Sequence, residues 1–217
     1  MEIPFQFQAY YHLAKGLYQT GPAHDFSHIE RVFTLALKIG KSEKADLWVL
    51  GLAALFHDLA RNEETQSDGE ICHAEAGALK TRQVLEGQGE NPGIIDNVCE
   101  CIATHRYRDQ NPPRTLEGKC LFDADKLDSL GAVGIARAYL WLGEHGGTVY
   151  VPRKEWEKTN FNNNRPEDDS LQREWYLKFR HLKDQLYTAT ARSLAANRDQ
   201  TMIDFLKTLE REVNGEE

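Results

Sequence analysis

The adjacent pair His57 and Asp58 is the most unusual feature of the sequence, because it lies near the end of its most apolar helical segment. Apolar residues occupy all sides of that segment, so we expect a central, buried helix. Burying an imidazole and a carboxylate without partners is costly, so something must satisfy them. A divalent cation would do so, with imidazole nitrogen and carboxylate oxygen as its ligands. A histidine–aspartate hydrogen bond at a helix end is the alternative interpretation.

Metal-competent side chains also occur on four other expected helices. His28 borders the apolar face of its helix, and His73 falls in the first turn of another. His105 follows apolar residues at spacings of three and four and should point inward. Asp125 stands one helical turn after Leu121. Any one of these residues is typical of a satisfied core position or a solvated face, but together they favour a shared metal site.

The elements that must position these residues are helices, because helical periodicity dominates and strand signals are few. This pattern predicts an all-α fold. The expected helices cover residues 5–18, 26–39, 44–60, 73–85, 92–105, 116–141 with a break near Gly131, 171–186 and 189–212. Residues 151–170 are polar and asparagine-rich, which predicts a loop that is either a mobile lid or a solvated connector.

The bulk properties predict one domain that covers residues 1–217, since no linker-like stretch divides the chain. We expect a metal-site core at about 20–145, with helices at about 170–213 packing on it. The formal net charge of −8 argues against extended nucleic-acid binding, so an anionic substrate requires local cations. No secretory signal is evident, and no apolar run approaches the about 20 residues of a membrane span. We therefore expect a cytoplasmic protein without a membrane partner.

Three stretches of sequence carry a family resemblance. They are His24-Asp25-Phe26-Ser27-His28-Ile29-Glu30-Arg31-Val32, Ala54-Leu55-Phe56-His57-Asp58-Leu59-Ala60-Arg61 and Asp123-Ala124-Asp125-Lys126-Leu127-Asp128-Ser129-Leu130-Gly131. Their order resembles the HD superfamily of metal-dependent phosphohydrolases, and their wording is similar to the small stand-alone HD hydrolases predicted in bacteria. The resemblance spans most of the chain. It implies a single-domain helical HD fold with the metal site at the centre of the helix bundle.

The same resemblance implies a set of metal ligands. It assigns His28, His57, Asp58 and Asp125 to a divalent cation. The sequence does not distinguish manganese, magnesium, iron, cobalt, nickel and zinc, and it does not give the number of metal ions.

Further residues are candidates for catalysis beside the ligand Asp58. His73 and His105 match two additional histidines of family members that hold a second metal, and in single-metal members such residues can face the substrate phosphate. Arg61 stands where many members have a lysine after the His-Asp pair, so we expect it to contact phosphate. Lys126 is a candidate for the same role, with a plain surface position as the alternative.

These expectations together predict hydrolysis of a phosphate ester or anhydride by a metal-activated water. The substrate implied by the resemblance is a nucleotide or a related small phosphorylated metabolite. One alternative keeps the fold and changes the chemistry, because HD-type di-iron oxygenases use a similar six-residue set. A second alternative is a nucleotide-binding module without catalysis.

Overall fold

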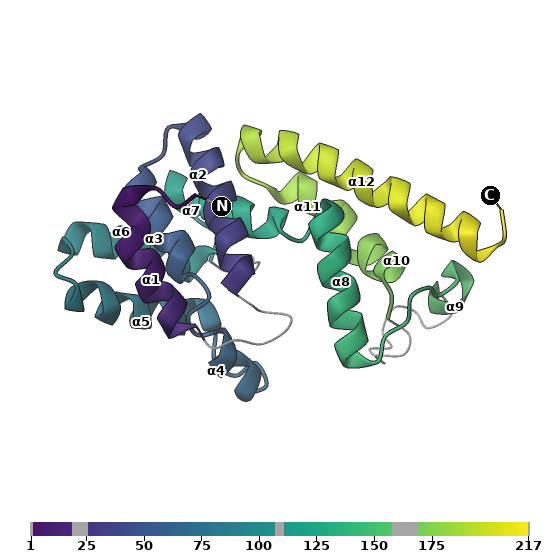
Figure 1. Cartoon of the computed structure of the whole chain (residues 1–217), viewed down its shortest axis with the longest axis horizontal. Coiled ribbons are helices and arrows are strands. Elements are labelled where there is room, and N and C mark those ends of the chain that lie inside the picture. Colours follow the sequence, from purple (N-terminus) through teal and green to yellow (C-terminus); the bar gives the residue numbers. More distant parts are fainter. Residues whose placement is uncertain (1, 19–25, 107–110, 158–168, 217) are drawn as a thin grey trace. The chain divides into compact units, whose positions relative to one another are not determined.

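The computed structural model describes residues 2–18, 26–106, 111–157 and 169–216 (Figure 1). Within these ranges the chain forms helices and no strands, so the prediction of an all-α fold is confirmed. The chain divides into two compact units. The first comprises Met1–Asp125 and Tyr187–Ala191, and the second comprises Lys126–Leu186 and Arg192–Glu217. The expectation of one domain, with the C-terminal helices packing on the metal-site core, stays a prediction.

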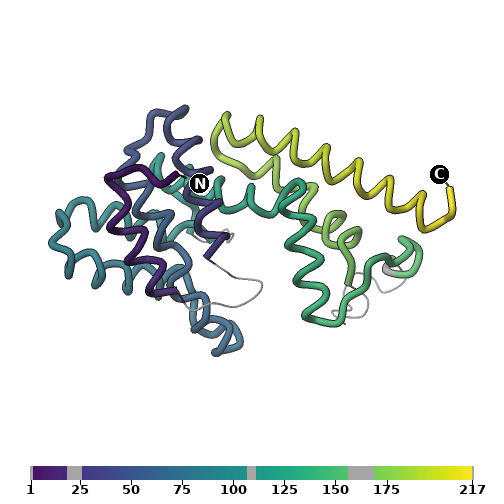
Figure 2. The backbone as a smooth tube through the Cα atoms, in the orientation of Figure 1, coloured from purple at the N-terminus to yellow at the C-terminus, as the bar shows by residue number. Residues whose placement is uncertain are grey.

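The first unit is a cluster of short helices around one apolar helix, α3. Its elements are η1 (Phe5–Phe7), α1 (Gln8–Leu17), α2 (Phe26–Glu43), α3 (Leu47–Phe56), α4 (Arg61–Gln66), α5 (His73–Gly87), α6 (Pro92–Thr104) and α7 (Leu116–Leu127) up to Asp125. Helix α3 packs against α1, α2 and α6, while α5 packs against α4 and α6. The backbone view shows α5 and α6 side by side (Figure 2). Helix α3 is therefore covered on several sides.

The boundaries of α3 follow from its flanking residues. The Asp46 carboxylate caps its start by accepting hydrogen bonds from the backbone N–H groups of Trp48 and Val49. Every residue from Val49 to Phe56 is buried, which confirms the predicted central helix. The helix is shorter than the predicted 44–60, because Lys44 has a left-handed φ of 65° and the helix ends before His57.

Small residues allow neighbouring helices to approach this region closely. A Cβ atom added to Gly40 on α2 would lie 2.4 Å from a methyl carbon of Leu50 on α3. A Cβ atom added to Gly77 on α5 would lie 3.3 Å from the backbone oxygen of His57. The glycine at position 77 thus lets α5 lie directly against the turn that carries the His-Asp pair.

The second unit contains the other helices. They are α8 (Gly131–His145), α9 (Arg153–Glu157), α10 (Leu171–Glu174), the π-helix η3 (Trp175–Phe179), α11 (Arg180–Gln185) and α12 (Ala189–Val213) from Arg192 onward. The predicted break near Gly131 is confirmed, since α7 ends at Leu127 and Gly131 begins α8 with a φ of 74°. That left-handed conformation favours glycine.

Three local predictions need correction. Helix α4 is absent from the predicted elements, because its six residues, RNEETQ, are polar and show no apolar period. Residues 153–157 form α9, so the prediction of a loop throughout 151–170 is wrong for this part. The predicted helix at 171–186 includes five residues in π-helical conformation. Residues 158–168 lie outside the described part of the chain, and the lid prediction therefore stays a prediction.

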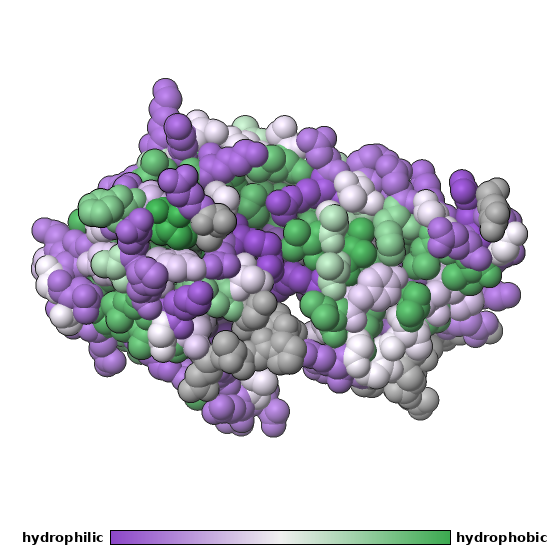
Figure 3. Space-filling view, viewed as in Figure 1, coloured by the Kyte–Doolittle hydropathy of each residue, from purple (hydrophilic) through white to green (hydrophobic). Residues whose placement is uncertain are grey.

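The surface mixes polar and apolar residues. Hydrophilic and hydrophobic side chains are interspersed on the face shown in Figure 3. Large exposed apolar residues such as Phe5, Leu79 and Val149 are far apart in the sequence. Among the helices that the structure describes, none has the length and apolar character needed to cross a membrane.

Candidate metal centre

The four predicted metal ligands come together in the first unit. His28 lies on α2, His57 and Asp58 form the turn after α3, and Asp125 lies on α7. His28 Nε2 is 3.4 Å from His57 Nε2, 3.7 Å from Asp58 Oδ2 and 3.5 Å from Asp125 Oδ1. The side chains of His57, His28 and Asp58 are 0%, 5% and 7% exposed, and that of Asp125 is 17% exposed. These buried polar groups are thus concentrated at one point.

His73 and His105 join the same cluster from the other side of Asp58. His73 is the first residue of α5, and His105 follows the last residue of α6. Their Nε2 atoms lie 3.2 Å apart, and 3.5 and 3.6 Å from Asp58 Oδ1. Both histidines are buried, so the predicted inward orientation of His105 is confirmed.

The hydrogen bonds of the histidines define which ring nitrogens carry protons. His57 Nδ1 lies 2.9 Å from the backbone oxygen of Ala54, and His105 Nδ1 lies 2.6 Å from that of Ile102. A carbonyl oxygen only accepts hydrogen bonds, so each Nδ1 is assigned the proton. The Nε2 atoms of both neutral rings consequently present lone pairs.

In His73 the acceptor of the Nδ1 proton is a side chain, not a backbone oxygen. Its Nδ1 lies 2.7 Å from Glu64 Oε2, which assigns the proton to Nδ1 and the lone pair to Nε2. Lone pairs of three histidines are therefore directed toward Asp58, whose Oδ1 is buried and has no hydrogen-bond partner in the described part of the chain. Such an arrangement is repulsive without a positive charge among these atoms. The residues thus fit a bound cation.

Two overlapping groups of side chains could each hold a metal ion. His28, His57 and Asp125 form one group, and His57, Asp58 and His105 form the other. Within each group the ligand atoms lie within 4.8 Å of one another. This set of imidazole nitrogens and carboxylate oxygens is suited to divalent metals. The two groups share His57, so the arrangement accommodates one ion or two.

The electrostatics keep these groups in their metal-binding forms. Burial lowers the pKa of His57 to about 4, and burial also lowers the pKa of His73 to about 4. Burial by itself would raise the pKa of Asp58, but the charge of Arg61 holds that pKa well below its usual value. At neutral pH the imidazoles of His57 and His73 are therefore neutral and the carboxylate of Asp58 is ionised, as metal coordination requires.

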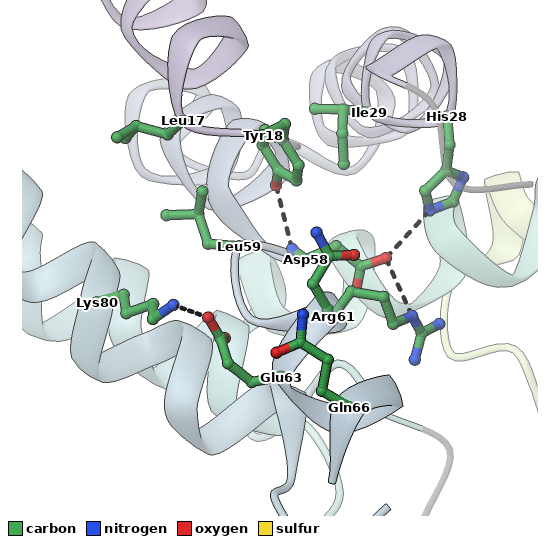
Figure 4. A pocket seen from close by; sticks show the side chains of 11 residues that line it. Leu17, Tyr18, His28, Ile29, Asp58, Leu59, Arg61, Glu63, Gln66 and Lys80 are labelled. Atoms are coloured by element: carbon green, nitrogen blue, oxygen red, sulfur yellow. Dashed lines mark hydrogen bonds and ion pairs between the residues drawn. The ribbon is translucent and has the colours of Figure 1, made fainter. Parts of the chain in front are cut away.

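Arg61 lies at the edge of the cluster, as Figure 4 shows. Its Nε is 3.6 Å from Asp58 Oδ2, and its Nη1 is 3.0 Å from Glu64 Oε2. Arg61, for which the sequence predicted a contact with phosphate, thus lies beside Asp58 and already forms ion pairs with two carboxylates. Lys126 belongs to the second unit, and its predicted role stays a prediction.

A polar cavity of about 140 Å³ opens beside His28 and Asp58. Arg61 and Lys80 contribute positive charge to its lining, and the Lys80 ammonium is paired with Glu63 (Figure 4). The hydroxyl oxygen of Tyr18 accepts a hydrogen bond from the backbone N–H of Asp58.

Sequence reasoning missed Tyr18, Glu64 and Lys80. The position of Glu64 six residues after Asp58 was a weak signal, and the other two were ordinary helix residues in the sequence.

Comparisons with known proteins identify the family of this chain. A model of the HD domain matches residues 25–130. The uncharacterized protein YpgQ of Bacillus subtilis is 33% identical over 196 residues, which cover 88% of this chain and 85% of YpgQ. The chain belongs to the HD superfamily, whose members are generally metal-dependent hydrolases.

Solved structures support the same conclusion. A crystal structure of B. subtilis YpgQ matches with a TM-score of 0.75 and 30% identity, covering 97% of this chain and 96% of that one. A predicted HD superfamily hydrolase from an uncultured Thermotogales bacterium matches with a TM-score of 0.67 and 27% identity, covering 95% and 92%. YpgQ has also been crystallised in complex with ADP, and that structure matches with a TM-score of 0.72 and 30% identity, covering 94% and 96%.

Proposed function

We propose that this chain is a metal-dependent phosphohydrolase that cleaves a phosphate ester or anhydride of a nucleotide or a related small metabolite. The observation that carries the proposal is the convergence of imidazole lone pairs from His57, His73 and His105 on the buried carboxylate of Asp58. Among the predicted chemistries, metal-assisted hydrolysis of an anionic ester uses this arrangement directly. The adjoining cavity supplies space for such a substrate.

Each side chain has a defined part in this proposal. His28, His57, Asp58 and Asp125 would hold a divalent cation, which supplies a water of lowered pKa and polarises a phosphoryl oxygen when bound. The guanidinium of Arg61 lines the cavity beside Asp58 and offsets negative charge on phosphate.

Other cations and histidines complete the proposed site. His73 and His105 would hold a second ion through Nε2; with a single ion, either ring would have to be protonated at Nε2 to donate a hydrogen bond to the phosphate or the leaving group. The ammonium of Lys80 adds positive charge at the part of the cavity lined by Glu63. Lys126 remains a proposed contact of phosphate.

Two observations support a nucleotide as the substrate. The related protein YpgQ has been crystallised with ADP. In this chain, cationic side chains line the cavity although the whole sequence carries a net charge of −8. Both basic side chains are paired with carboxylates, so a phosphate would share or displace these pairs, and such a confined site in an acidic protein suits a small anion better than an extended polyanion.

The proposal is tested by measuring metal content and hydrolysis together. The protein is purified without added metal and subjected to elemental analysis, and it is then assayed on phosphate monoesters, phosphodiesters, ADP and nucleoside triphosphates. We expect a divalent metal and release of phosphate or pyrophosphate from a nucleotide. Asp125→Asn should lose most of this release, whereas Asp204→Asn, at an exposed position on α12, should retain it.

Two other results would overturn the proposal. Bound iron with oxygen consumption and no hydrolysis would indicate the di-iron oxygenase. Metal binding without turnover of any phosphorylated compound, while nucleotide still binds, would indicate a binding module.

Replacement of His73 or His105 by alanine reports on the number of metal ions. If the site holds two ions, each variant should lose one bound ion per chain and retain the ion of His28 and Asp125, and with either number of ions the rate should fall about 10²–10³-fold. Full occupancy with a reduced rate would indicate a single ion, with the two histidines acting on the substrate. Unchanged metal content and rate would make both histidines structural. Elemental analysis and initial rates at saturating substrate distinguish these outcomes.

A further inference from the structure

Glu64 is a buried carboxylate next to the histidine cluster, and its side chain contacts three basic groups. It lies on α4 and is 9% exposed. Its Oε2 is 2.7 Å from His73 Nδ1 and 3.0 Å from Arg61 Nη1, while its Oε1 forms an ion pair with Arg106. The two guanidinium groups fix the orientation of this carboxylate, so it presents a fixed acceptor to His73.

His73 requires such an acceptor because of its place in the fold. His57 and His105 each follow the last residue of a helix, so the carbonyl three residues earlier accepts their Nδ1 protons. His73 is the first residue of α5 and has no preceding helical turn. The acceptor for its Nδ1 therefore comes from another helix, and Glu64 on α4 provides it.

Arg61 is a second neighbour of His73, and its position bears on which ring nitrogen of His73 carries the proton. Its Nη1 lies 3.1 Å from His73 Nδ1 and 3.5 Å from His73 Nε2, so it is a donor beside both ring nitrogens. With Glu64 in place, His73 Nδ1 donates a hydrogen bond to the Glu64 carboxylate, and Arg61 donates another hydrogen bond to the same carboxylate. Without the carboxylate, Nδ1 would lose its acceptor, whereas Nε2 would still lie 3.5 Å from Asp58 Oδ1, so the neutral ring would carry its proton on Nε2 instead.

We infer that Glu64 is a positioning residue that holds the proton of His73 on Nδ1 and thereby directs the Nε2 lone pair at Asp58. Carboxylates behind metal-binding or catalytic histidines act in this way generally. The consequences for metal affinity and turnover rest on the proposed function. The tautomer of His73 does not depend on it.

The inference is tested first by NMR on metal-free protein labelled with ¹⁵N-histidine, with His73→Gln identifying the His73 signals. We expect wild-type His73 to be the Nδ1–H tautomer and Glu64→Ala to convert it mainly to the Nε2–H tautomer. Glu63→Ala is the matched control, because it removes a carboxylate from the same helix whose partner is Lys80. An unchanged tautomer in a folded Glu64→Ala protein would overturn the inference.

A second variant keeps the test decisive where the alanine protein does not fold. Glu64→Gln retains an oxygen acceptor, so its His73 should remain the Nδ1–H tautomer. The Nε2–H tautomer in this variant would contradict the inference.

Metal binding provides a second readout. Titration with Mn²⁺ alone should show affinity lowered about 10–100-fold in Glu64→Ala and less in Glu64→Gln. Equal Mn²⁺ affinity in the wild type and Glu64→Ala would overturn the proposed effect on the metal. If the wild type lacks hydrolytic activity, the proposed function fails, whereas the tautomer result still decides the role of Glu64.

Discussion

Asp58→Ala is expected to abolish metal binding and to lower hydrolysis about 10³-fold or more, while most of the helical signal remains. Both carboxylate oxygens of Asp58 face histidine Nε2 atoms, at 3.5 to 3.9 Å. Asp58 also joins the two sides of the cluster, since its Oδ2 lies near His28 and its Oδ1 near His105. Loss of the metal removes several kcal/mol of transition-state charge stabilisation, and each 1.4 kcal/mol corresponds to about tenfold in rate.

The stability of this variant should depend on added metal. In metal-free protein the substitution removes a buried carboxylate whose Oδ1 has no hydrogen-bond partner among the described residues, which offsets the loss of its pairing with Arg61. A ligand at about 100 times its dissociation constant stabilises a native protein by about 2.7 kcal/mol. We therefore expect added Mn²⁺ to raise the unfolding midpoint of the wild type and to leave that of Asp58→Ala unchanged.

Three measurements check this prediction: elemental analysis, phosphate release, and thermal unfolding followed by circular dichroism. Asp204→Ala is the control, because it removes an exposed aspartate whose side chain accepts a hydrogen bond from Gln200. Full metal occupancy and normal turnover in Asp58→Ala would exclude Asp58 as a ligand.

The main helices and the location of the cluster were predictable because hydrophobic patterning specifies them. Helix α3 is apolar on all sides, which required a central position, and the polar pair His57 and Asp58 that follows it therefore had to meet polar partners. His105 could be oriented from the apolar residues at helical spacing before it. The apolar patterns thus predicted which polar residues are buried, and the buried polar residues form the site.

The residues that surround the proposed metal ligands were not predictable, because no hydrophobic pattern in the sequence marks them. Glu64 belongs to a six-residue polar helix, in which no periodicity distinguishes a buried carboxylate from a solvated one. Its burial depends on Arg61, Arg106 and His73, which come from three separate segments. Lys80 on α5 likewise resembles an ordinary exposed lysine in the sequence. Only the tertiary arrangement gives these side chains their neighbours.

Asp123 and Asp125 show how two similar residues in one motif acquire different positions. They are two residues apart on α7, which turns their side chains to nearly opposite faces of the helix. Asp125 lies 3.5 Å from His28. Asp123 is fully buried and accepts hydrogen bonds from the backbone N–H groups of Tyr187 and Thr188 and from the Thr188 hydroxyl, at 2.9, 2.7 and 2.7 Å. Asp123 thus holds the segment that leads into α12.

Asp123→Ala is therefore expected to destabilise the protein by about 4 kcal/mol, because two backbone N–H groups and a hydroxyl lose a charged acceptor. Thr188 is buried, so water does not readily replace the carboxylate. Asp123→Asn should cost less, since its amide oxygen can still accept hydrogen bonds. Urea unfolding of metal-free wild type, both variants and the exposed control Asp204→Ala measures the differences. Metal content measured well below the unfolding midpoint should stay near the wild-type value in Asp123→Asn. A loss below about 1 kcal/mol in Asp123→Ala would show that these hydrogen bonds do not hold the start of α12.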